Sequence, residues 1–458
     1  MRRLYGFIML LALAFIGPAF SQQRWERTYG GGANEQANSV QQTADGGYII
    51  AGWTQSFGSG NKDIYLIKTN SQGDTLWTRT YGGGSDEEGY SVQQTLDGGY
   101  IVVGWTESFN AWHGDIYLIK TNAMGDTLWT KYYRVQYYEW GHFVQQTRDS
   151  GYIIAGIQNY NFNFIYLVKT NSQGDTLWTR TYSELAGSDS SSFGYCVRQT
   201  RDGGYIVAGQ KFFSMHEDAY LFRTNSQGDT LWTRNWGRSG IECFQSVLQT
   251  QDSGFIASGY SGWGLFIVRT NALGDTLWTK LYGGLSGHSM DQTMDGGYIF
   301  AGDEGSFDVF LAKCNAQGDT LWTKRYGGAR QDIGRSVQQT QDGGYIIAGF
   351  TDSYGAGGQD FYLIKTDASG SSGVEEENGG GIRRPIIREA CFTATPNPFT
   401  SFTRVPGHTS ERFVLYDVSG RRVGTYKGDR IGEGLRAGVY FVRSLGQGGK
   451  PLRVVKIR

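Results

Sequence analysis

The chain has 458 residues, a formal net charge of −1, 39% hydrophobic residues, 15% aromatic residues and 69 glycines. This composition is typical of a turn-rich globular protein and excludes a disordered chain. The four cysteines form no C-x-x-C pair, so the sequence predicts neither a disulfide framework nor a metal site, although a bond between Cys196 and Cys243 stays open.

Residues 1–21 have the features of a secretory signal peptide. They begin M-R-R, continue through an apolar run from Leu4 to Ile16, and end with small residues near the expected cleavage site, Ala19 and Ser21. The apolar run is short for a bilayer, which makes a retained anchor helix the weaker alternative. We therefore predict cleavage after Ser21. The mature chain should have no transmembrane segment and be secreted or held on the exterior of the outer membrane.

Residues 22–370 repeat one unit seven times, and each unit contains the runs S-V-Q-Q-T, D-G-G-Y-I-I-A-G, D-I-Y-L-I-K-T-N and S-Q-G-D-T-L-W-T or close variants. The runs alternate in polarity or are rich in β-branched and aromatic residues, and tight-turn pairs separate them. Four short strands per unit predict an all-β fold, a seven-bladed β-propeller with four strands per blade. The tryptophan that marks each unit is Trp25, Trp77, Trp129, Trp178, Trp232, Trp278 and Trp322.

The two ends of the repeat region complete each other. The last unit ends with the run Tyr362 to Thr366 and no tryptophan follows it, whereas the first tryptophan has no such run before it. We therefore predict a closed ring in which the strand Arg24 to Tyr29 pairs with the last blade as its outer strand. The repeat region contains no proline, as expected where backbone N–H groups are needed for strand pairing.

The repeat sequence Y-L-I-K-T-N-S-Q-G-D-T-L-W resembles the tryptophan-docking repeat of quinoprotein-like propellers. The resemblance implies that a glycine turn joins two strands and that the following tryptophan packs between blades. Those enzymes generally have eight blades and often an adjacent cysteine pair, whereas this chain has seven units and no Cys-Cys. We therefore expect no cofactor. The repeats also resemble those of secreted bacterial propeller-repeat proteins, some of which carry a loose endoglucanase label.

A second domain is predicted after the repeats. Residues 371–390 are rich in Gly, Ser and Glu and predict a flexible linker, and residues 391–458 form the predicted C-terminal domain. The charge changes sign here, because residues 388–458 hold 13 Lys or Arg and 5 Asp or Glu, against 27 and 38 in residues 22–387. No aromatic platform accompanies the basic residues, so we do not expect nucleic-acid binding.

The C-terminal domain carries four sequence blocks in order, T-A-T-P-N-P-F, V-L-Y-D-V-S-G-R-R-V, G-L-R-A-G-V-Y-F-V-R and K-P-L-R-V-V-K-I-R. They resemble the type A C-terminal sorting domain of type IX secretion cargo. The resemblance implies a small β-sandwich, recognition by the secretion machinery, export through the outer membrane and removal of the tail. An immunoglobulin-like module of the flagellar hook-capping protein shares two of these blocks, so a purely structural β-sandwich stays open. The sorting motif that the resemblance implies comprises Asn397, Pro398, Phe399, Tyr416, Asp417, Gly420, Arg421, Gly438 and Tyr440.

The connections between strands differ in how far they vary among the units. The Asp-Gly-Gly and Gln-Gly-Asp turns are short and nearly identical, whereas the other connections vary in length and carry aromatic residues. Variable loops on a fixed scaffold are common binding surfaces. We therefore predict a ligand-binding face that contains Trp105, Trp112, Phe213 and Trp263.

One position just before the inner strand is acidic in five of the seven units. We expect these carboxylates to form a ring around one mouth of the central channel, where they could bind a cation or a polar ligand. In the alternative, each carboxylate accepts N–H bonds from its glycine-rich link and is structural. Glycoside hydrolysis would need two carboxylates at a defined separation. The five acids are Glu35, Glu87, Glu139, Glu242 and Asp332.

Other repeated residues are predicted to serve the fold. The Asp of each D-G-G forms a turn, the tryptophans pack between blades, and the second Gln of S-V-Q-Q-T satisfies buried polar groups. The sequence has no G-x-S-x-G, Walker or H-E-x-x-H motif, so no catalytic residue is predicted. We expect an exported, monomeric binding module for a glycan, a peptide or a matrix component. The alternative is a secreted polysaccharide-degrading enzyme, and the third choice is a structural envelope protein.

Overall fold

The computed structural model describes residues 23–109, 114–134, 138–160, 162–182, 191–213, 216–237, 240–262, 264–305 and 308–373, together with 403–404, 412–417, 421–427, 430–431, 434–444 and 452–456. The chain divides into two compact units, residues 1–380 and 381–458. Every regular element of the described residues is a β-strand. Within these residues, no helix is long and apolar enough to cross a membrane.

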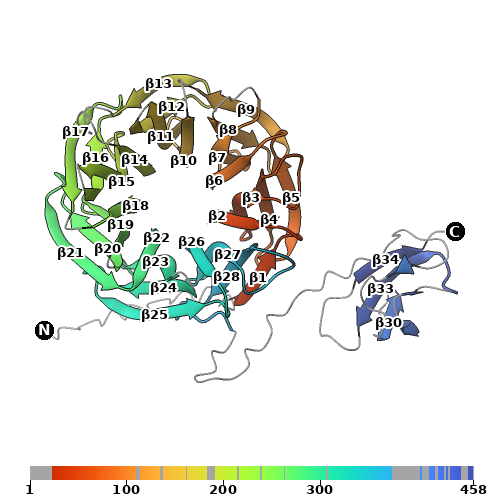
Figure 1. Cartoon of the computed structure of the whole chain (residues 1–458). Coiled ribbons are helices and arrows are strands. Elements are labelled where there is room, and N and C mark those ends of the chain that lie inside the picture. The colour runs from red at the N-terminus through yellow and green to blue at the C-terminus, as the bar shows by residue number, and fades with distance from the viewer. Residues whose placement is uncertain are drawn as a thin grey trace, which may run out of the picture. The chain divides into compact units, whose positions relative to one another are not determined.

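The first unit is a ring of seven four-stranded antiparallel sheets (Figure 1), which confirms the predicted seven-bladed propeller. Blade 1 contains β2 (Glu35–Gln42), β3 (Tyr48–Thr54), β4 (Asp63–Thr69) and β5 (Thr75–Tyr81). Blade 2 contains β6 (Glu87–Gln94), β7 (Tyr100–Thr106), β8 (Asp115–Thr121) and β9 (Thr127–Tyr133). Blade 3 contains β10 (Tyr138–Gln146), β11 (Tyr152–Tyr160), β12 (Phe162–Thr170) and β13 (Thr176–Thr181). Blade 4 contains β14 (Ser192–Gln199), β15 (Tyr205–Phe213), β16 (His216–Thr224) and β17 (Thr230–Trp236).

The remaining blades follow the same order. Blade 5 contains β18 (Glu242–Gln249), β19 (Phe255–Ser261), β20 (Gly264–Thr270) and β21 (Thr276–Gly283). Blade 6 contains β22 (Leu285–Gln292), β23 (Tyr298–Glu304), β24 (Asp308–Cys314) and β25 (Thr320–Tyr326). Blade 7 contains β26 (Asp332–Gln339), β27 (Tyr345–Thr351), β28 (Asp360–Thr366) and, as its outer strand, β1 (Trp25–Tyr29).

The ring closes through β1, as predicted. This strand pairs antiparallel with β28, with Trp25 opposite Lys365 and Tyr29 opposite Phe361. A buried carboxylate reinforces the joint, because Glu26 accepts hydrogen bonds from the hydroxyl groups of Tyr362 and Ser372. The outer strand of the last blade therefore comes from the start of the propeller sequence.

The hydrophobic core lies between the blades. The second and third strands are mostly buried, and β3 and β4 are buried at every residue. Their branched and aromatic side chains cover both faces of the sheet, so each blade needs a neighbour on both sides. Between blades 1 and 2, for example, Ile49 and Leu66 pack in one cluster with Val102 and Tyr117.

The tryptophan of each outer strand docks onto the next blade, which confirms its predicted packing role. The Trp77 ring lies edge-on to the Tyr100 ring with their centroids 5.8 Å apart. It also covers Gly125, where an added Cβ would come within 2.8 Å of the indole. Gly125 has a φ of 79°, which favours glycine for a second reason. The hydroxyl of Tyr81 donates to the carbonyl oxygen of Gly125 at 2.6 Å. Both Trp77 and Tyr81 therefore hold the turn that contains Gly125.

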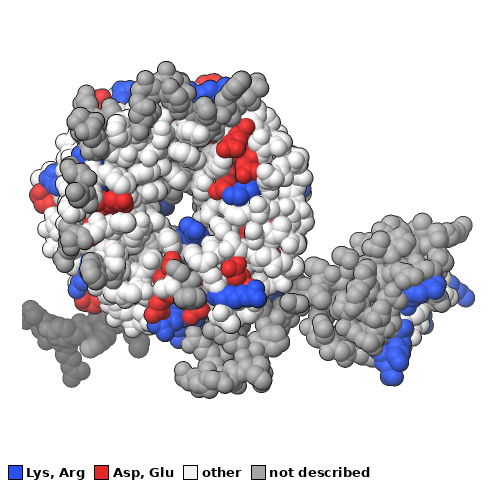
Figure 2. Space-filling model, viewed as in Figure 1, with Lys and Arg blue, Asp and Glu red and all other residues white. Residues whose placement is uncertain are grey.

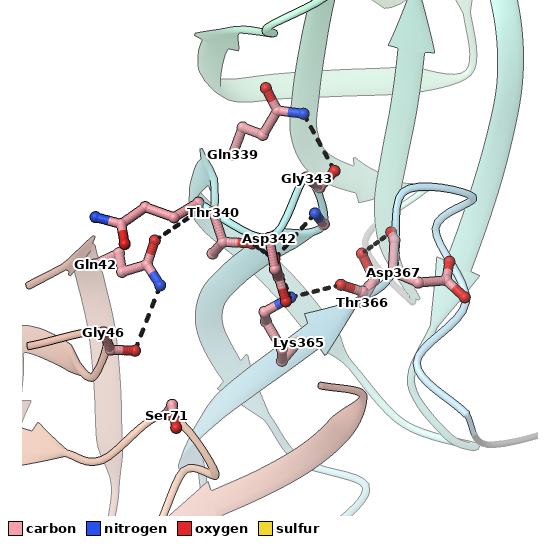
Figure 3. A network of polar contacts seen from close by, with 12 residues as sticks. Gln42, Gly46, Ser71, Gln339, Thr340, Asp342, Gly343, Lys365, Thr366 and Asp367 are labelled. Carbon is pink, nitrogen blue, oxygen red and sulfur yellow. Dashed lines mark hydrogen bonds and ion pairs between the residues drawn. The ribbon is translucent and has the colours of Figure 1, made fainter. Parts of the chain in front are cut away.

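The Asp of each D-G-G turn binds a basic side chain of the third strand, a role beyond the predicted turn formation. In blade 2, the buried Lys120 Nζ lies 2.9 Å from Asp97 Oδ2 and donates to the carbonyl oxygen of Thr121 at 2.9 Å. In blade 7, Figure 3 shows Lys365 in the same place between Asp342 and Thr366. Each pair joins the turn to the third strand of its blade.

The described part of the second unit is a small β-structure. Strands β31 (Arg422–Lys427), β30 (Arg412–Asp417), β33 (Gly438–Ser444) and β34 (Leu452–Lys456) form one sheet in that order, and β29 (Thr403–Arg404) pairs with β32 (Arg430–Ile431). Ile431 packs with Phe413, Leu415 and Val442 of the larger sheet, so the two sheets share one core.

Candidate functional site

The first strand of every blade lies next to the central channel, where its free edge exposes backbone N–H groups. Side chains from the preceding blade pair with these groups. Ser39 Oγ accepts from the backbone N–H of Val92 at 3.2 Å, and Gln41 Oε1 accepts from that of Gln94 at 2.6 Å. Buried N–H groups require such partners. The Ser and the first Gln of the S-V-Q-Q sequence are therefore explained by the N–H groups that they pair with on the neighbouring strand. We call these contacts the inner belt.

The inner belt continues around the ring through the first glutamine of each run. The oxygens of Gln93, Gln145 and Gln338 accept from the next inner strand at 2.6 to 2.7 Å. In blades 4 and 5 this position holds Arg198 and Leu248, which cannot accept a hydrogen bond. The belt therefore lacks its glutamine acceptor at two neighbouring joints.

The second glutamine of each run is structural, but it pairs with exposed N–H groups of the D-G-G turns and not with the buried polar groups predicted for it. Gln94 Oε1 accepts from the backbone N–H of Ala44 at 2.8 Å, and Gln42 Oε1 accepts from that of Gln341 at 2.8 Å. Figure 3 shows Gln42 at the joint between blades 7 and 1. These bonds hold neighbouring D-G-G turns together.

Each inner strand has a β-bulge at the same place, and the bulge turns one residue toward the channel. The pairing register shifts between the third and fifth equivalent positions of all seven strands, for example between Gly89 and Ser91. The fourth residue is thus the extra one, and bulges commonly re-aim a side chain. We call these seven residues the bulge ring: Asn38, Tyr90, His142, Tyr195, Gln245, His288 and Arg335.

The bulge ring lines a single cavity in the channel. All seven side chains are half-buried and border a space of about 440 Å³. A volume of this size is within the usual range for small-ligand sites. The belt residues of the inner strands form the rest of the wall.

One half of the bulge ring is aromatic. The rings of Tyr90 and His142 have centroids 5.3 Å apart, and those of His142 and Tyr195 lie 5.4 Å apart. Phe193 stacks beside Tyr195 at 6.3 Å. Burial lowers the pKa of His142 to about 4, so this imidazole is neutral at pH 7 and joins the wall as an uncharged ring.

The other half of the bulge ring is polar. His288 Nδ1 lies 2.9 Å from Gln245 Oε1, and His288 Nε2 lies 2.6 Å from Asp303 Oδ1. Asn38 Nδ2 donates to the carbonyl oxygen of Gly89 at 2.8 Å. The guanidinium of Arg335 lies over the Phe350 ring, 5.8 Å from its centroid.

The acidic groups near the cavity already have partners. Glu88 is bound by Lys62 Nζ at 2.5 Å and by the hydroxyl of Tyr90 at 2.8 Å. Asp303 is paired with His288, and Asp291 accepts from the backbone N–H of Gln339 at 2.9 Å. Each of these carboxylates is therefore engaged within the protein.

In contrast to the acidic groups, some donor groups of the cavity have no hydrogen-bond partner within the described part of the protein. Among the described residues, the buried donor atoms Arg198 Nε and Arg335 Nε have no hydrogen-bond partner. Burial lowers the pKa of the Arg335 guanidinium, and the charges of Asp303 and Glu88 oppose that shift. Figure 2 shows basic atoms inside the central opening. The cavity is thus left with donors that a ligand could use.

The acids predicted from the sequence are not in this cavity. Glu87 is fully buried, and its carboxylate accepts from the backbone N–H groups of Gly83 at 2.7 Å and Ser108 at 3.2 Å. Glu35 makes the equivalent bonds to Gly31 and Ser56. Glu139, Glu242 and Asp332 are likewise buried. For Glu35 and Glu87, this geometry matches the structural alternative, in which the carboxylate accepts N–H groups of its inter-blade link.

The predicted aromatic residues are only partly described. Trp105 lies in strand β7, not in a variable loop, because the second strand extends through it. Its indole N–H donates to the hydroxyl of Tyr90 at 3.1 Å, which connects it to the bulge ring. Trp112, Trp263 and the side chain of Phe213 lie outside the described residues.

The bulge ring was not predicted, although the sequence contains a signal for it. When the seven inner strands are aligned, the following Val-x-Gln-Thr positions are nearly constant, whereas the fourth position holds Asn, Tyr, His, Tyr, Gln, His and Arg. A position that varies between otherwise constant positions indicates a residue that the fold does not require to be of one type. His142 and His288 lie on inner strands and border the channel cavity.

The described residues contain no group of three or more His, Cys, Asp or Glu side chains that could hold a metal ion. The described cysteines Cys196, Cys243 and Cys314 are free and buried. The pairing of Cys196 with Cys243 that the sequence left open is therefore absent.

The described sorting-motif residues are structural in their contacts. Asp417 and Arg421 close the hairpin between β30 and β31, because Asp417 Oδ1 accepts from the backbone N–H of Arg421 at 3.1 Å. Tyr440 is buried in the core and donates to the carbonyl oxygen of Arg436 at 2.8 Å. Tyr416 lies opposite Phe441 in the sheet, and Gly438 begins β33. Asn397, Pro398, Phe399 and Gly420 lie outside the described residues.

No family model and no curated protein matches the chain. Among solved structures, the WD40 β-propeller domain of Doa1 is 12% identical with a TM-score of 0.50, covering 77% of this chain and 99% of that one. Raptor from Chaetomium thermophilum is 10% identical with a TM-score of 0.49, covering 76% and 30%. A protein of unknown function from Dyadobacter fermentans is 11% identical with a TM-score of 0.45, covering 76% and 99%. The likeness to the Doa1 domain shows the β-propeller fold alone.

Proposed function

We propose that this WD40-like propeller is a binding module that takes its ligand in the central channel, at the bulge ring. The observation that carries the proposal is the contrast between a repeated scaffold and one varied, channel-facing position. Seven copies keep the same turns and tryptophan docking, yet they present five different residue types to one cavity. Propellers commonly bind partners through such surfaces, and a concave site with a few convergent polar groups favours a ligand.

Export is part of this proposal. Residues 1–21 have the pattern of a signal peptide, and the four C-terminal blocks resemble a type IX sorting domain. The ligand would then be extracellular, a glycan, a peptide or a matrix component. Export predicts that producing cells cleave the chain between Ala368 and Cys391, and a mature surface form that retains residues 439–458 would contradict it.

Binding is favoured over hydrolysis. A glycosidase needs one carboxyl group to transfer a proton and a second to act as base or nucleophile. Near the cavity, Glu88 is bound by Lys62 and Asp303 is paired with His288. These contacts support a binding site in which acids orient basic side chains.

The test is a screen of the full chain on glycan and peptide arrays, followed by calorimetry with the best binder. Gln245→Trp fills the channel and should abolish binding. The same substitution at the exposed turn residue Gln227 is the control and should leave binding unchanged. If Gln245→Trp binds normally while truncation of Trp112 and Trp263 to Ala abolishes binding, the ligand lies on the variable loops and the channel proposal is wrong.

A further inference from the structure

We propose that the channel binds an acidic oligosaccharide, a sugar chain that carries a carboxylate, with its ring against the aromatic half of the bulge ring and its carboxylate at Arg335. This inference rests on the proposed function and names the chemical class of its ligand. It follows from three features of the cavity: two walls of different character, occupied backbone groups and an excess of free donors.

The two walls match the two sides of a sugar. A pyranose has an apolar C–H face and a rim of hydroxyl groups. Tyr90, neutral His142 and Tyr195 offer flat aromatic surfaces on blades 2 to 4. Aromatic rings bury such apolar faces and keep a polar edge for hydrogen bonding. Gln245 and His288, on blades 5 and 6, offer polar groups that can meet hydroxyls.

The inner belt disfavours an extended peptide. Peptides often bind a β-protein by adding a strand to a free edge, through main-chain hydrogen bonds. Here most of the inner edge is already covered, because Ser39, Gln41 and their equivalents accept N–H groups of the neighbouring inner strand, and an acceptor at the glutamine position is missing only where Arg198 and Leu248 stand. A ligand in the channel is therefore recognised mainly through side chains.

The free donors favour an anionic ligand. Asp291, Asp303 and Glu88 all have partners inside the protein. Arg335 Nε and Arg198 Nε are buried without a hydrogen-bond partner among the described residues. Leaving buried donors unpaired is costly, and a guanidinium pairs with a carboxylate through two parallel bonds. A carboxylate-bearing sugar would satisfy these groups.

The experiment is calorimetry of the full chain with trimers of galacturonate, glucuronate and mannuronate. Each trimer is compared with its methyl ester, which keeps the shape and removes the charge. We expect at least one free acid to bind at least about tenfold more tightly than its ester, since bonds to charged groups are strong. Arg335→Gln should abolish this difference. Tyr195→Leu should weaken acid and ester together.

Arg325→Gln is the matched control, because Arg325 lies on the outer strand β25 with an exposed side chain and should leave binding unchanged. Melting curves confirm that each variant is folded. If acid and ester bind equally, or if Arg335→Gln binds the acid as tightly as the wild type does, the proposed carboxylate contact with Arg335 is wrong. If only peptides bind, and Gln245→Trp blocks them, the sugar assignment is wrong and the channel proposal stands. If no ligand responds to Gln245→Trp, both fail.

Discussion

The acids before the inner strands recur in most units, whereas the bulge residues differ from unit to unit, and the two sets have different explanations. Before the inner strands, Glu35 and Glu87 recur as acids because each performs the same local task, accepting N–H groups of its link. At the bulge, Asn38, Tyr90 and Arg335 differ because the scaffold makes no common demand on them. The repeated charge is therefore explained by structure, whereas the unrepeated residues of the bulge carry the proposed function.

The Asp–Lys pairs of the D-G-G turns give a prediction for acid stability. Burial alone would raise the pKa of Asp97, but bonds from Thr95, Lys120 and Gly99 outweigh it and hold the pKa at about 2, below its ordinary 3.8. The pKa of Asp295 is also about 2, because equivalent bonds outweigh the effect of burial there.

A carboxyl group whose pKa is lowered by folding stabilises the folded state above its unfolded pKa. That stability is lost as the pH falls through the folded value. The urea midpoint should therefore fall between about pH 4 and pH 2. The Asp97 and Asp295 side chains are more than half exposed, so each contribution is small and the effect is the sum over the repeats.

The measurement is urea unfolding from pH 7 to pH 2 for the wild type and Asp97→Asn. The variant should have a lower midpoint at pH 7 and a shallower decline in acid. Glu107→Gln, at an exposed loop position, is the control and should keep the wild-type slope. An identical slope for Asp97→Asn would show that this pair does not govern acid stability.

At the scale of strands, local patterns predicted most of the fold. Alternating runs separated by Asp-Gly-Gly and Gln-Gly-Asp indicated the strands and hairpins, and the Gly and Trp of each unit indicated docking between blades. The bulge was not predictable in this way. Strict alternation places Asn38 and Val40 on one face, whereas the extra residue breaks that period. The bulge is a shift in the pairing between two strands of the ring. The sequence of one strand alone therefore does not predict it.

The inner belt gives a prediction at this scale. Gln93→Leu copies the natural leucine at position 248 and removes the acceptor for the backbone N–H of Gln146. An unpaired buried N–H costs about 1 to 3 kcal/mol of unfolding free energy. Hydrogen exchange should also become faster in the β10 segment. Gln173→Leu, in an exposed turn, is the control. Unchanged exchange in β10 would contradict the role given to the belt.

At the scale of the whole propeller, closure depends on one strand. β1 supplies the outer strand of blade 7, and Trp25 docks on blade 1 through its indole N–H, which donates to the carbonyl oxygen of Ser71 at 3.2 Å. The ring therefore has one joint that is not continuous in sequence. The stability of this joint determines how firmly blade 7 is attached to blade 1.

Deletion of residues 22–31 removes this strand and should lower the melting temperature by more than about 5 °C, because β28 loses its partner and a buried tryptophan is removed. Arg24→Ala, which removes an exposed ion pair with Asp367, is the control and should change the melting temperature by less than about 2 °C. A deletion variant that melts like the wild type would show that β1 does not close the ring.

The same joint sets an order of events during synthesis. Glu26 and its partner Tyr362 are separated by 336 residues, so the first strand to be made waits for the last one before it can pair. Contacts of such long range form late in folding. Six blades can assemble as each is completed, but the channel gains its full wall only when the seventh arrives. Under the proposed function, ligand binding would require completion of the propeller, because a truncated product would lack both the closed ring and Arg335.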